Sequence, residues 1–353
     1  MSDRRNTILV GDAVTRLREI PPATIDTVIS SPPYFLLRDY QVVGQLGLED
    51  SVDEWVRRLR VVMAEVARVL TPTGSVWLNL GDTYSRHDKF GAPPKGLLLA
   101  PERLLLALSA DGWRCRNKII WHKPNGMPTS VGDRLSTNYD VVYFLTRSQH
   151  YYFDLDAIRV PHVSSQGRTA GVADKRRPDW AGPLAGSNSG LHRFRPPGIP
   201  GHLLGKNPGD VWRIPTRPFQ GAHFATFPEA LVERPLLATC PEKVCVGCGT
   251  PWKRTPGKTF ILGTRRPAGR DRHVRRYPGA WRVLRQPGPM AASCGCDAAS
   301  RPGVVLDPFF GTGTVGVVAQ RLGRDWLGIE LNPGYAELAW SRLRNSRASE
   351  RAA

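Results

Sequence analysis

The stretch at residues 303–322, GVVLDPFFGTGTVGVVAQRL, constrains the fold more than any other part of the chain. Residues 303–306 have the pattern of a short buried strand, residues 307–314 form a glycine-rich turn, and residues 315–322 show helical spacing of apolar residues. In this arrangement the free N–H groups of the helix face a ligand at the carboxyl end of the strand. The segment therefore predicts an α/β fold with a binding site at that edge.

The first 150 residues show the same alternation of strands and helices, and the chain returns to it after residue 226. Ser51 and Glu54 form a capping-box pattern, which predicts the start of a helix that ends at Thr71 and Pro72. Strand patterns cover residues 25–30, 75–80, 117–121, 139–146 and 326–329, and helix patterns cover residues 51–70, 101–110, 227–238 and 333–345. This alternation predicts an α/β protein with a mostly parallel central sheet.

The chain of 353 residues has a net charge of +18, and this charge is clustered. Residues 155–220 hold ten Lys/Arg against four Asp/Glu, and residues 251–290 hold eleven against the single Asp271. Sixteen of the eighteen excess positive charges thus lie in two segments, which is typical of a surface that binds a polyanion such as nucleic acid. Solubility in an Arg-rich organism is the alternative, but it predicts spread rather than clustering.

Residues 155–215 interrupt the periodic pattern. They are rich in Gly, Pro, Ser and Arg, as in GPLAGSNSGLHRFRPPGIPG, and cannot supply much core. A disordered linker and a functional loop that orders on a partner both fit this composition. The positive charge, together with Trp180 and Phe194, favours the functional loop.

The sequence shows no sign of membrane insertion or export. No stretch approaches the roughly 20 apolar residues of a membrane span, and the N-terminus MSDRRNTILVGDA lacks the apolar core of a signal peptide. We therefore expect a soluble protein that acts in the cytoplasm and has no membrane partner.

Four of the six cysteines lie in two short motifs, CVGC and CGC, that flank the most basic segment. In a reducing compartment this spacing favours a metal over disulfides. A candidate structural zinc site with four thiolate ligands consists of Cys245, Cys248, Cys294 and Cys296. Unpaired buried cysteines are the alternative; Cys240 is a substitute ligand in this scheme, and we expect Cys115 to pack in the core. The zinc would fix an arginine-rich arm that contacts phosphates.

Ser31-Pro32-Pro33-Tyr34 follows the first predicted strand and carries the sharpest chemical signal in the chain. Methylation of an exocyclic amine requires acceptors for both N–H groups, so that the nitrogen lone pair can leave conjugation with the ring. The Ser31 hydroxyl and the Pro32 carbonyl are such acceptors, and the two prolines fix that carbonyl away from any sheet partner. Tyr34 can stack on the face of a flipped base. A proline-rich turn with a core tyrosine is the alternative.

The glycine turn by itself leaves its ligand open. Gly311 and Gly313 allow the backbone to approach a nucleotide cofactor, and Glu330 is placed to accept hydrogen bonds from two ribose hydroxyls. A nicotinamide-dependent oxidoreductase would share these features, as would a turn without a ligand. However, GTGT lacks the third glycine of the GxGxxG pattern, and an oxidoreductase has no use for SPPY or for clustered positive charge.

Together these motifs resemble the permuted β class of amino-methylating DNA methyltransferases, which use S-adenosyl-L-methionine. SSPPY resembles the catalytic motif of the class, and LDPFFGTGT with GIELNPGYAELAWSRL resembles its cofactor motifs. GSVWLNLGDTY and CRNKIIWHKPN are similar to segments that build the target pocket, NYDVVYFLTR to a later sheet strand, and GKNPGDVWRIPT and HFATFPEALV to segments before the cofactor motif. The resemblance implies a Rossmann-like methyltransferase fold in circularly permuted motif order, with an inserted recognition region and a zinc-knuckle-like arm.

The resemblance also implies roles for individual residues. The catalytic set would be Ser31, Pro32, Pro33 and Tyr34. The cofactor set would be Asp307, Phe309, Gly311, Gly313 and Thr314 for the methionine and ribose part, Glu330 for the ribose, Asp12 near the adenine, and Thr226, Phe227 and Pro228 at the methionine end. In this family a serine variant of the tetrapeptide usually accompanies methylation of cytosine N4, whereas aspartate or asparagine usually accompanies adenine N6. We therefore expect transfer to cytosine N4, with adenine N6 as the alternative.

The same resemblance divides the chain into segments. They are a catalytic half at residues 1–154, a target-recognition region at 155–215, a return to the core at 216–239, the cysteine-flanked basic insertion at 240–300, the cofactor half at 301–347 and a disordered tail at 348–353. The expected partners are double-stranded DNA and a cognate restriction endonuclease acting on the same site. An RNA or protein amine methyltransferase is an alternative, as is a non-catalytic zinc-dependent DNA-binding protein.

Overall fold

The computed structural model describes residues 5–126, 130–161, 204–216, 227–255, 259–263, 281–285 and 288–352. The chain divides into two compact units. The first consists of residues 1–154, 209–253 and 292–353, and the second of residues 155–208 and 254–291. Among the described helices, none has the length and apolar surface needed to traverse a bilayer.

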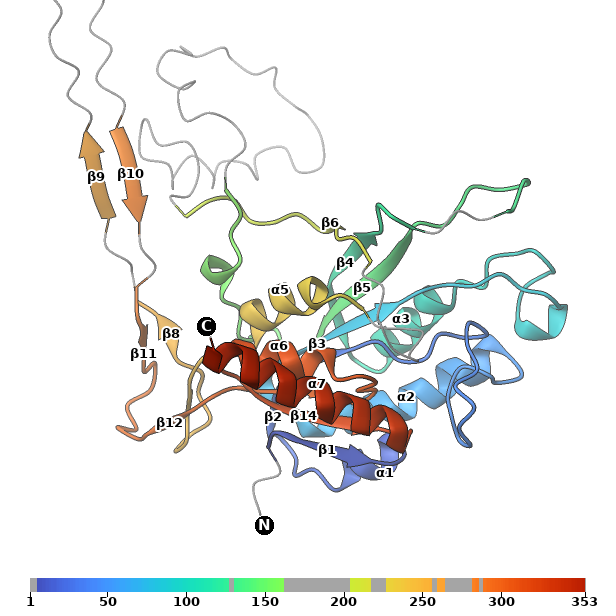
Figure 1. Ribbon diagram of the computed structural model, residues 1–353, viewed down its shortest axis with the longest axis horizontal. Coiled ribbons are helices and arrows are strands. Elements are labelled where there is room, and N and C mark those ends of the chain that lie inside the picture. Colours follow the sequence, from blue (N-terminus) through green and yellow to red (C-terminus); the bar gives the residue numbers. More distant parts are fainter. Residues whose placement is uncertain are drawn as a thin grey trace, which may run out of the picture. The chain divides into compact units, whose positions relative to one another are not determined.

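The first unit is built on an eight-stranded sheet (Figure 1). In spatial order its strands are β1 (Thr7–Val10), β14 (Asp325–Glu330), β13 (Val304–Asp307), β2 (Ile25–Ser30), β3 (Leu70–Leu80), β5 (Tyr139–Thr146), β4 (Arg114–His122) and β6 (Val211–Arg213). Neighbouring strands are parallel, except that β5 is antiparallel to both β3 and β4. The predicted mostly parallel central sheet is therefore confirmed.

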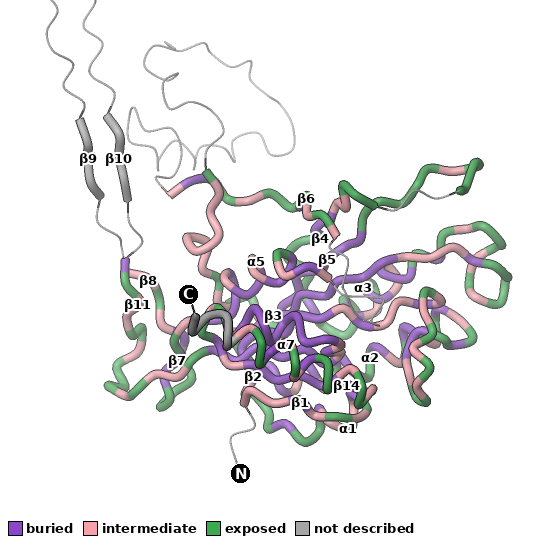
Figure 2. Tube along the Cα trace, in the orientation of Figure 1, coloured by how far each residue is buried: buried purple, intermediate pink, exposed green. Residues whose placement is uncertain are grey.

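Helices cover both faces of this sheet, so the first unit has three layers. One layer contains α1 (Ala13–Arg18), α2 (Val52–Val69) and α3 (Ala100–Ala110), and the other contains α5 (Glu229–Thr239), α6 (Thr314–Arg321) and α7 (Pro333–Ala352). Val28 packs with the first layer and Ile29 with the second, because successive side chains of a strand point to opposite faces. Strand β2 is accordingly buried along its whole length (Figure 2).

Strands β2 and β13 are neighbours in space although they come from opposite ends of the sequence. Thr27 pairs with Val305 and Val28 with Leu306 in parallel register. Because parallel strands end at the same edge of a sheet, the turn after β2 lies next to the turn after β13. The structure thus confirms the permuted order, in which SPPY comes first in the chain and DPFFGTGT last.

The helix predicted at Ser51 forms, but its capping box forms only in part. Ser51 Oγ accepts a hydrogen bond from the Glu54 N–H at 3.2 Å. The Glu54 carboxylate does not return to the helix start; it accepts instead from Arg57, at 2.8 Å from Nε. The side-chain cap is therefore made by Ser51, and Glu54 forms an exposed ion pair one turn along the helix.

Short elements differ from the expectations. Strand β1 and helix α1 were not predicted; β1 extends the sheet, with Val10 opposite Glu330. Strand β6 lies within residues 155–215, which the sequence indicated to be irregular, yet Val211 pairs with Ile120 of β4. An element of this length is too short for an alternation pattern to identify.

Within the residues that the structure describes, the remaining short elements are two 3₁₀ turns and three two-stranded ladders. The turns are η1 (Asp88–Phe90) and η2 (Leu155–Ala157), and the ladders pair β7 (Val244–Cys245) with β12 (Ser300–Arg301), β8 (Lys253–Arg254) with β11 (Met290–Ala291), and β9 (Thr259–Gly263) with β10 (Trp281–Arg285). Most of the predicted recognition region, residues 162–203, and residues 264–280 of the basic insertion lie outside the described residues.

Candidate active site

A cavity of about 240 Å³ lies at the carboxyl edge of the sheet in the first unit. Its walls come from the segments after β1, β2, β13 and β14, from the loop before α2, and from α2 itself. Lining residues from these segments include Asp12, Ser31, Tyr40, Arg58, Phe309, Gly311 and Glu330. This is the edge at which parallel α/β sheets bind their ligands.

Asp307, the last residue of β13, lies beneath the glycine turn and is not part of the cavity wall. Its Oδ1 accepts hydrogen bonds from Ser30 Oγ at 2.6 Å and from the Phe309 N–H at 3.0 Å. Burial raises the pKa of this carboxyl to about 7, although the hydrogen bonds from Ser30 and Phe309 act against it. Asp307 thus ties the end of β2 to the start of the turn, which holds the two motifs together.

Glu330, the last residue of β14, orients the turn from the cavity side. Its Oε2 accepts from the Gly311 N–H at 2.7 Å and its Oε1 from the Asn332 N–H at 2.8 Å. Burial raises the pKa of this carboxyl, and the two backbone donors oppose the shift. Because a carboxylate oxygen has two lone pairs, both oxygens retain the capacity to accept from a ribose hydroxyl.

The turn needs its glycines for two different reasons. Gly311 and Gly313 have φ angles of 53° and 78°, in the left-handed region that favours glycine. Phe310, which comes just before Gly311, packs under the turn, where a Cβ added at Gly328 would lie 2.4 Å from its ring and one at Gly316 2.7 Å. The glycines of TVGVV and WLGIE therefore leave room for Phe310, which fixes the position of the turn on the sheet.

The structure brings most of the other predicted cofactor residues to the same cavity. The lining includes Asp12, Phe227, Phe309 and Thr314. Asp12 also caps α1, because its Oδ1 accepts from the Thr15 N–H at 2.9 Å. Gly313 and Pro228 do not line the cavity; they occupy the N-cap positions of α6 and α5. Thr226 lies outside the described residues.

The turn after β2 is anchored by a hydrogen bond from α2. Trp55 Nε1 donates to the Pro33 carbonyl at 2.9 Å. Within the described ranges no hydrogen bond reaches the Pro32 carbonyl, and Ser31 lies in the cavity wall. Ser31 and Pro33 thus line the cavity, whereas Pro32 is buried and is not part of its wall. That Ser31 and the Pro32 carbonyl accept from a substrate amine stays a prediction.

A polar network from three neighbouring strands surrounds Ser31. Asn79 Nδ2, on β3, lies 2.8 Å from Tyr34 OH and 3.3 Å from Ser31 Oγ. Tyr34 OH lies 3.3 Å from Ser31 Oγ and 3.3 Å from Asp140 Oδ2, on β5. Lys123 Nζ, just after β4, forms an ion pair with Asp140 Oδ2 at 2.6 Å. Asn79, Lys123 and Asp140 lie in segments that resemble the family, but their roles were not predicted from the sequence.

Tyr34 is held by its ring as well as by its hydroxyl. A Cβ added at Gly81 would lie 2.6 Å from Tyr34 Cε2, so only glycine leaves room for the ring there. Burial, and then the negative charge of Asp140, raise the pKa of Tyr34 well above its usual value. The phenol therefore keeps its proton and acts as a hydroxyl within the network. Stacking of Tyr34 on a base stays a prediction.

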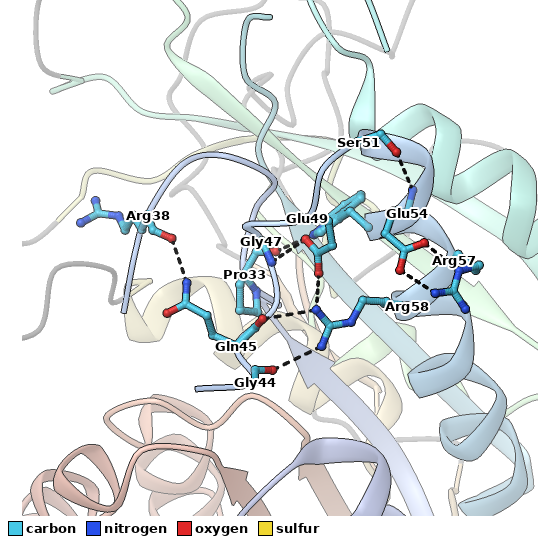
Figure 3. A network of polar contacts seen from close by, with 11 residues as sticks. Pro33, Arg38, Gly44, Gln45, Gly47, Glu49, Ser51, Glu54, Arg57 and Arg58 are labelled. Atoms are coloured by element: carbon cyan, nitrogen blue, oxygen red, sulfur yellow. Dashed lines mark hydrogen bonds and ion pairs between the residues drawn. The ribbon is translucent and has the colours of Figure 1, made fainter. Parts of the chain in front are cut away.

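The loop between β2 and α2 forms a further wall of the cavity. Figure 3 shows the polar contacts that this loop makes with α2. Arg58, on α2, donates to the Gly44 carbonyl at 3.3 Å and pairs with Glu49 at 3.0 Å. The Glu49 side chain is only 2% exposed, and its Oε2 accepts from the Gly47 N–H at 2.8 Å. Arg58 thus holds the loop over the cavity, a role that the sequence pattern of α2 did not indicate.

The four predicted metal ligands come together in the first unit. Their Sγ atoms, on Cys245, Cys248, Cys294 and Cys296, all lie within 4.8 Å of one another. Zn–S bonds of about 2.3 Å place the sulfurs of a tetrahedron about 3.8 Å apart, so this set fits a zinc ion after small adjustments. Pairing of β7 with β12, and a hydrogen bond from the Val246 N–H to the Ala299 carbonyl at 3.0 Å, hold the two cysteine motifs together.

The two other cysteines are separate from this cluster. Cys240 is buried at the end of α5. The expectation that Cys115 packs in the core is wrong, because this residue is exposed. Residues 114–118 at the start of β4 are all exposed, and the strand register shifts between Cys115 and Asn117. Cys115 therefore lies on an exposed stretch of β4 and not in the core.

Comparisons with known proteins identify the family of this chain. A family model described as DNA methylase, of the type that methylates amino nitrogens at N6 or N4, matches residues 25–246 and 297–341. The type II methyltransferase M.SfiI of Streptomyces fimbriatus is 35% identical over 93% of this chain and 88% of its own. M.Cfr9I of Citrobacter freundii is 31% identical over 96% of this chain and 87% of its own. The family match leaves out residues 247–296, which contain the basic segment at residues 251–290.

Among solved structures, the PvuII DNA methyltransferase, described as cytosine-N4-specific, is similar in fold. Its TM-score is 0.56 at 16% identity, and the match covers 95% of this chain and 85% of the other. Fold and site together define an S-adenosylmethionine-dependent amino-methyltransferase with permuted motif order. The chain belongs to the N6/N4 DNA methylase family.

Proposed function

We propose that this protein is a site-specific DNA methyltransferase that methylates the exocyclic N4 amine of cytosine in a flipped-out base. The geometry at Ser31 carries the proposal. A serine hydroxyl in the cavity wall is followed by the Pro32 carbonyl, which has no hydrogen bond within the described ranges. Two neighbouring acceptors suit an amine with two N–H groups.

The residues after β2 polarise the amine. Ser31 Oγ and the Pro32 carbonyl accept its two N–H groups, which draws the nitrogen lone pair out of conjugation and toward the cofactor cavity. S-adenosylmethionine, when bound, supplies an electrophilic methyl group on a sulfonium leaving group. The protein therefore needs to align the amine rather than to provide a nucleophile. In keeping with this, no cysteine lines the described cavity.

We assign the cofactor to this cavity from the chemistry of its wall. Glu330 offers two acceptor oxygens for ribose hydroxyls, and the turn through Gly311 and Thr314 borders the methionine part. Asp12 lies where the adenine would fit, at the start of α1. Asp307, beneath the turn, positions the backbone through the hydrogen bond that it accepts from the Phe309 N–H.

Two observations favour cytosine over adenine. The tetrapeptide begins with serine, the variant that resembles the cytosine-N4 enzymes of the family. One solved structure of similar fold is described as cytosine-N4-specific, which supports this choice. Adenine N6 is the alternative, because that amine also presents two N–H groups to Ser31 and Pro32.

We further propose that the two basic segments contact DNA. Residues 155–215 would read the target sequence, and residues 251–290 would follow phosphates as an arm whose base is fixed by a structural zinc ion on the four clustered thiolates. The type II names of the relatives support a cognate restriction endonuclease, with both proteins acting on DNA in a bacterial cytoplasm. An intact Ser31 and Glu330 argue against a non-catalytic DNA-binding role.

The test is to express the protein in a host that lacks DNA methylation and to analyse the digested DNA by nucleoside mass spectrometry. We expect N4-methylcytosine, and sequencing of the modified DNA would give the site. N6-methyladenine would establish the alternative base, and methylated RNA or protein with unmodified DNA would contradict the proposed substrate.

The role of Ser31 has its own test. Ser31→Ala should lower the single-turnover rate of methyl transfer by about 10²-fold or more while the cofactor dissociation constant changes by less than about threefold. Ser109→Ala, an exposed serine on α3, is the matched control and should leave the rate unchanged. An undiminished rate for Ser31→Ala would remove Ser31 from the catalytic set.

A further inference from the structure

The hydrogen-bonding capacity of Ser31 is almost fully used by its neighbours. Asn79 Nδ2 has two hydrogens, and they fit Tyr34 OH at 2.8 Å and Ser31 Oγ at 3.3 Å. The phenol oxygen can accept from both Asn79 and Ser31 because it has two lone pairs. Its own hydrogen is then free to point to Asp140 Oδ2, at 3.3 Å.

The ion pair at the far end of this network sets its direction. Asp140 pairs with Lys123 as a carboxylate, and an ionised carboxyl group can only accept hydrogen bonds. Tyr34 keeps its proton, because burial and the charge of Asp140 raise the pKa of its phenol. Tyr34 therefore donates to Asp140, and Ser31 donates to Tyr34. One lone pair of Ser31 Oγ is left over, and it faces the position assigned to the amine of the base.

We propose that Ser31, Tyr34 and Asp140 form a proton relay that removes the proton released by methylation. An amine nitrogen that has gained a methyl group carries a positive charge and loses it when one N–H bond breaks. That proton forms a new bond to Ser31 Oγ, the former Ser31 proton passes to the Tyr34 oxygen, and the former Tyr34 proton passes to Asp140 Oδ2. The two hydroxyls end as they began, and Asp140 ends as a neutral carboxylic acid.

The surroundings of the relay favour this route over direct transfer of the proton to water. Asp140 is 9% exposed, so its carboxylate is shielded from solvent. The Lys123 side chain is 23% exposed, so the end of the relay borders solvent and can be reset there. The two 3.3 Å contacts are longer than a typical O–H···O bond of about 2.7 Å. Catalytic hydrogen bonds are often long without substrate and shorten in the complex.

The relay rests on the proposed role of Ser31, but it does not depend on which base is methylated. The decisive variants keep the shape of the site and remove one transfer step each. Asp140→Asn removes the final acceptor, and Tyr34→Phe keeps the aromatic ring for stacking while removing the hydroxyl. Each should lower the single-turnover rate by about 10²-fold, the usual scale for general acid–base catalysis, with cofactor and DNA dissociation constants within about threefold of the wild type.

A double-mutant cycle separates a relay from two independent structural effects. In a relay, the Tyr34→Phe/Asp140→Asn double variant should be no more than about threefold slower than the slower single variant, because one missing link already stops the transfer. If the two effects were independent, the rate loss of the double variant would equal the product of the two single losses. Asp133→Asn is the matched control: it removes an exposed carboxylate, paired only with Lys95, from the loop between β4 and β5.

Several outcomes would overturn the relay. A wild-type rate in Asp140→Asn, or a double variant whose loss equals the product of the single losses, would do so. If Asp140→Asn fails to fold, Tyr34→Phe decides, since a phenyl group cannot pass a proton and a wild-type rate in that variant excludes the route. Ser31→Ala distinguishes failure of the relay from failure of the proposed function. An inactive Ser31→Ala with an active Asp140→Asn rejects the relay alone, whereas an active Ser31→Ala rejects the proposed role of Ser31.

Discussion

Replacement of Asp307 by asparagine isolates the ionisation of one buried carboxyl group. Both hydrogen bonds that the structure gives Asp307, from Ser30 Oγ and from the Phe309 N–H, end on Oδ1. An asparagine can place its amide oxygen at the same position and keep both bonds. The change therefore leaves the turn intact and removes only the ability to lose a proton.

The sign and size of the effect follow from the pKa of this group. Its usual value is 3.8, and burial raises it to about 7 in the folded protein. Between these values the folded chain binds a proton that the unfolded chain lacks, so the free energy of unfolding falls as pH rises from about 4 to about 7. At about 1.4 kcal/mol per pH unit the full effect is about 4 kcal/mol, of which roughly 2–3 kcal/mol falls between pH 5 and pH 8.

Urea unfolding of the wild type and of Asp307→Asn, each without cofactor at pH 5 and pH 8, measures this effect. The variant should gain roughly 2–3 kcal/mol relative to the wild type between the two pH values. Asp26 also has a raised pKa, but it is present in both proteins and its contribution cancels in the difference. The charge of Glu330 contributes to the raised pKa of Asp307, so the coupling between these two groups is part of the measured difference. Asp50→Asn, an exposed carboxylate, is the control. A difference between wild type and variant that stays constant with pH would refute the reasoning.

Two further substitutions test the supports of the site. Trp55→Phe removes the indole N–H that donates to the Pro33 carbonyl but keeps an aromatic ring; the single-turnover rate should fall about fivefold to tenfold, for a hydrogen bond of about 1 kcal/mol, with an unchanged cofactor dissociation constant. An equal loss in cofactor binding would show that Trp55 supports the cavity rather than the catalytic turn. Cys294→Ser should reduce the zinc content of freshly purified protein from about one ion per chain to less than half, measured by elemental analysis. A full zinc content in that variant would exclude Cys294 as a ligand.

The long elements could be predicted because their patterns are local. Ser51 marked the start of α2, and the apolar run Ile25–Ser30 marked a strand that is buried on both faces. The parallel pairing of β2 with β13 in the structure explains why Ser31 and Gly311 come to one edge of the sheet. Strand β6 could not be predicted in the same way, since its pairing with β4 depends on tertiary structure.

The residues around Ser31 could not be predicted from the sequence for a related reason. Asn79 and Lys123 come at or near the ends of strands that are parallel to one another, whereas Asp140 comes at the start of β5. Strand β5 is antiparallel to both neighbours, so its first residues lie at the edge where β3 and β4 end. Sequence patterns do not show strand direction within a mixed sheet, so the convergence of these side chains requires the structure.

The cysteine cluster explains how the family fold accommodates a long basic insertion. The family match stops at residue 246 and resumes at residue 297, and Cys245 and Cys296 lie at these two ends. Cys245 pairs with Ser300 across the β7–β12 ladder, so the chain leaves and re-enters the core at one place. The ends of an insertion that meet in this way do not strain the sheet, and a metal shared by both ends would offset the entropy of closing a long loop. A basic arm could therefore be added between α5 and β13 without a change in the position of DPFFGTGT beside SPPY.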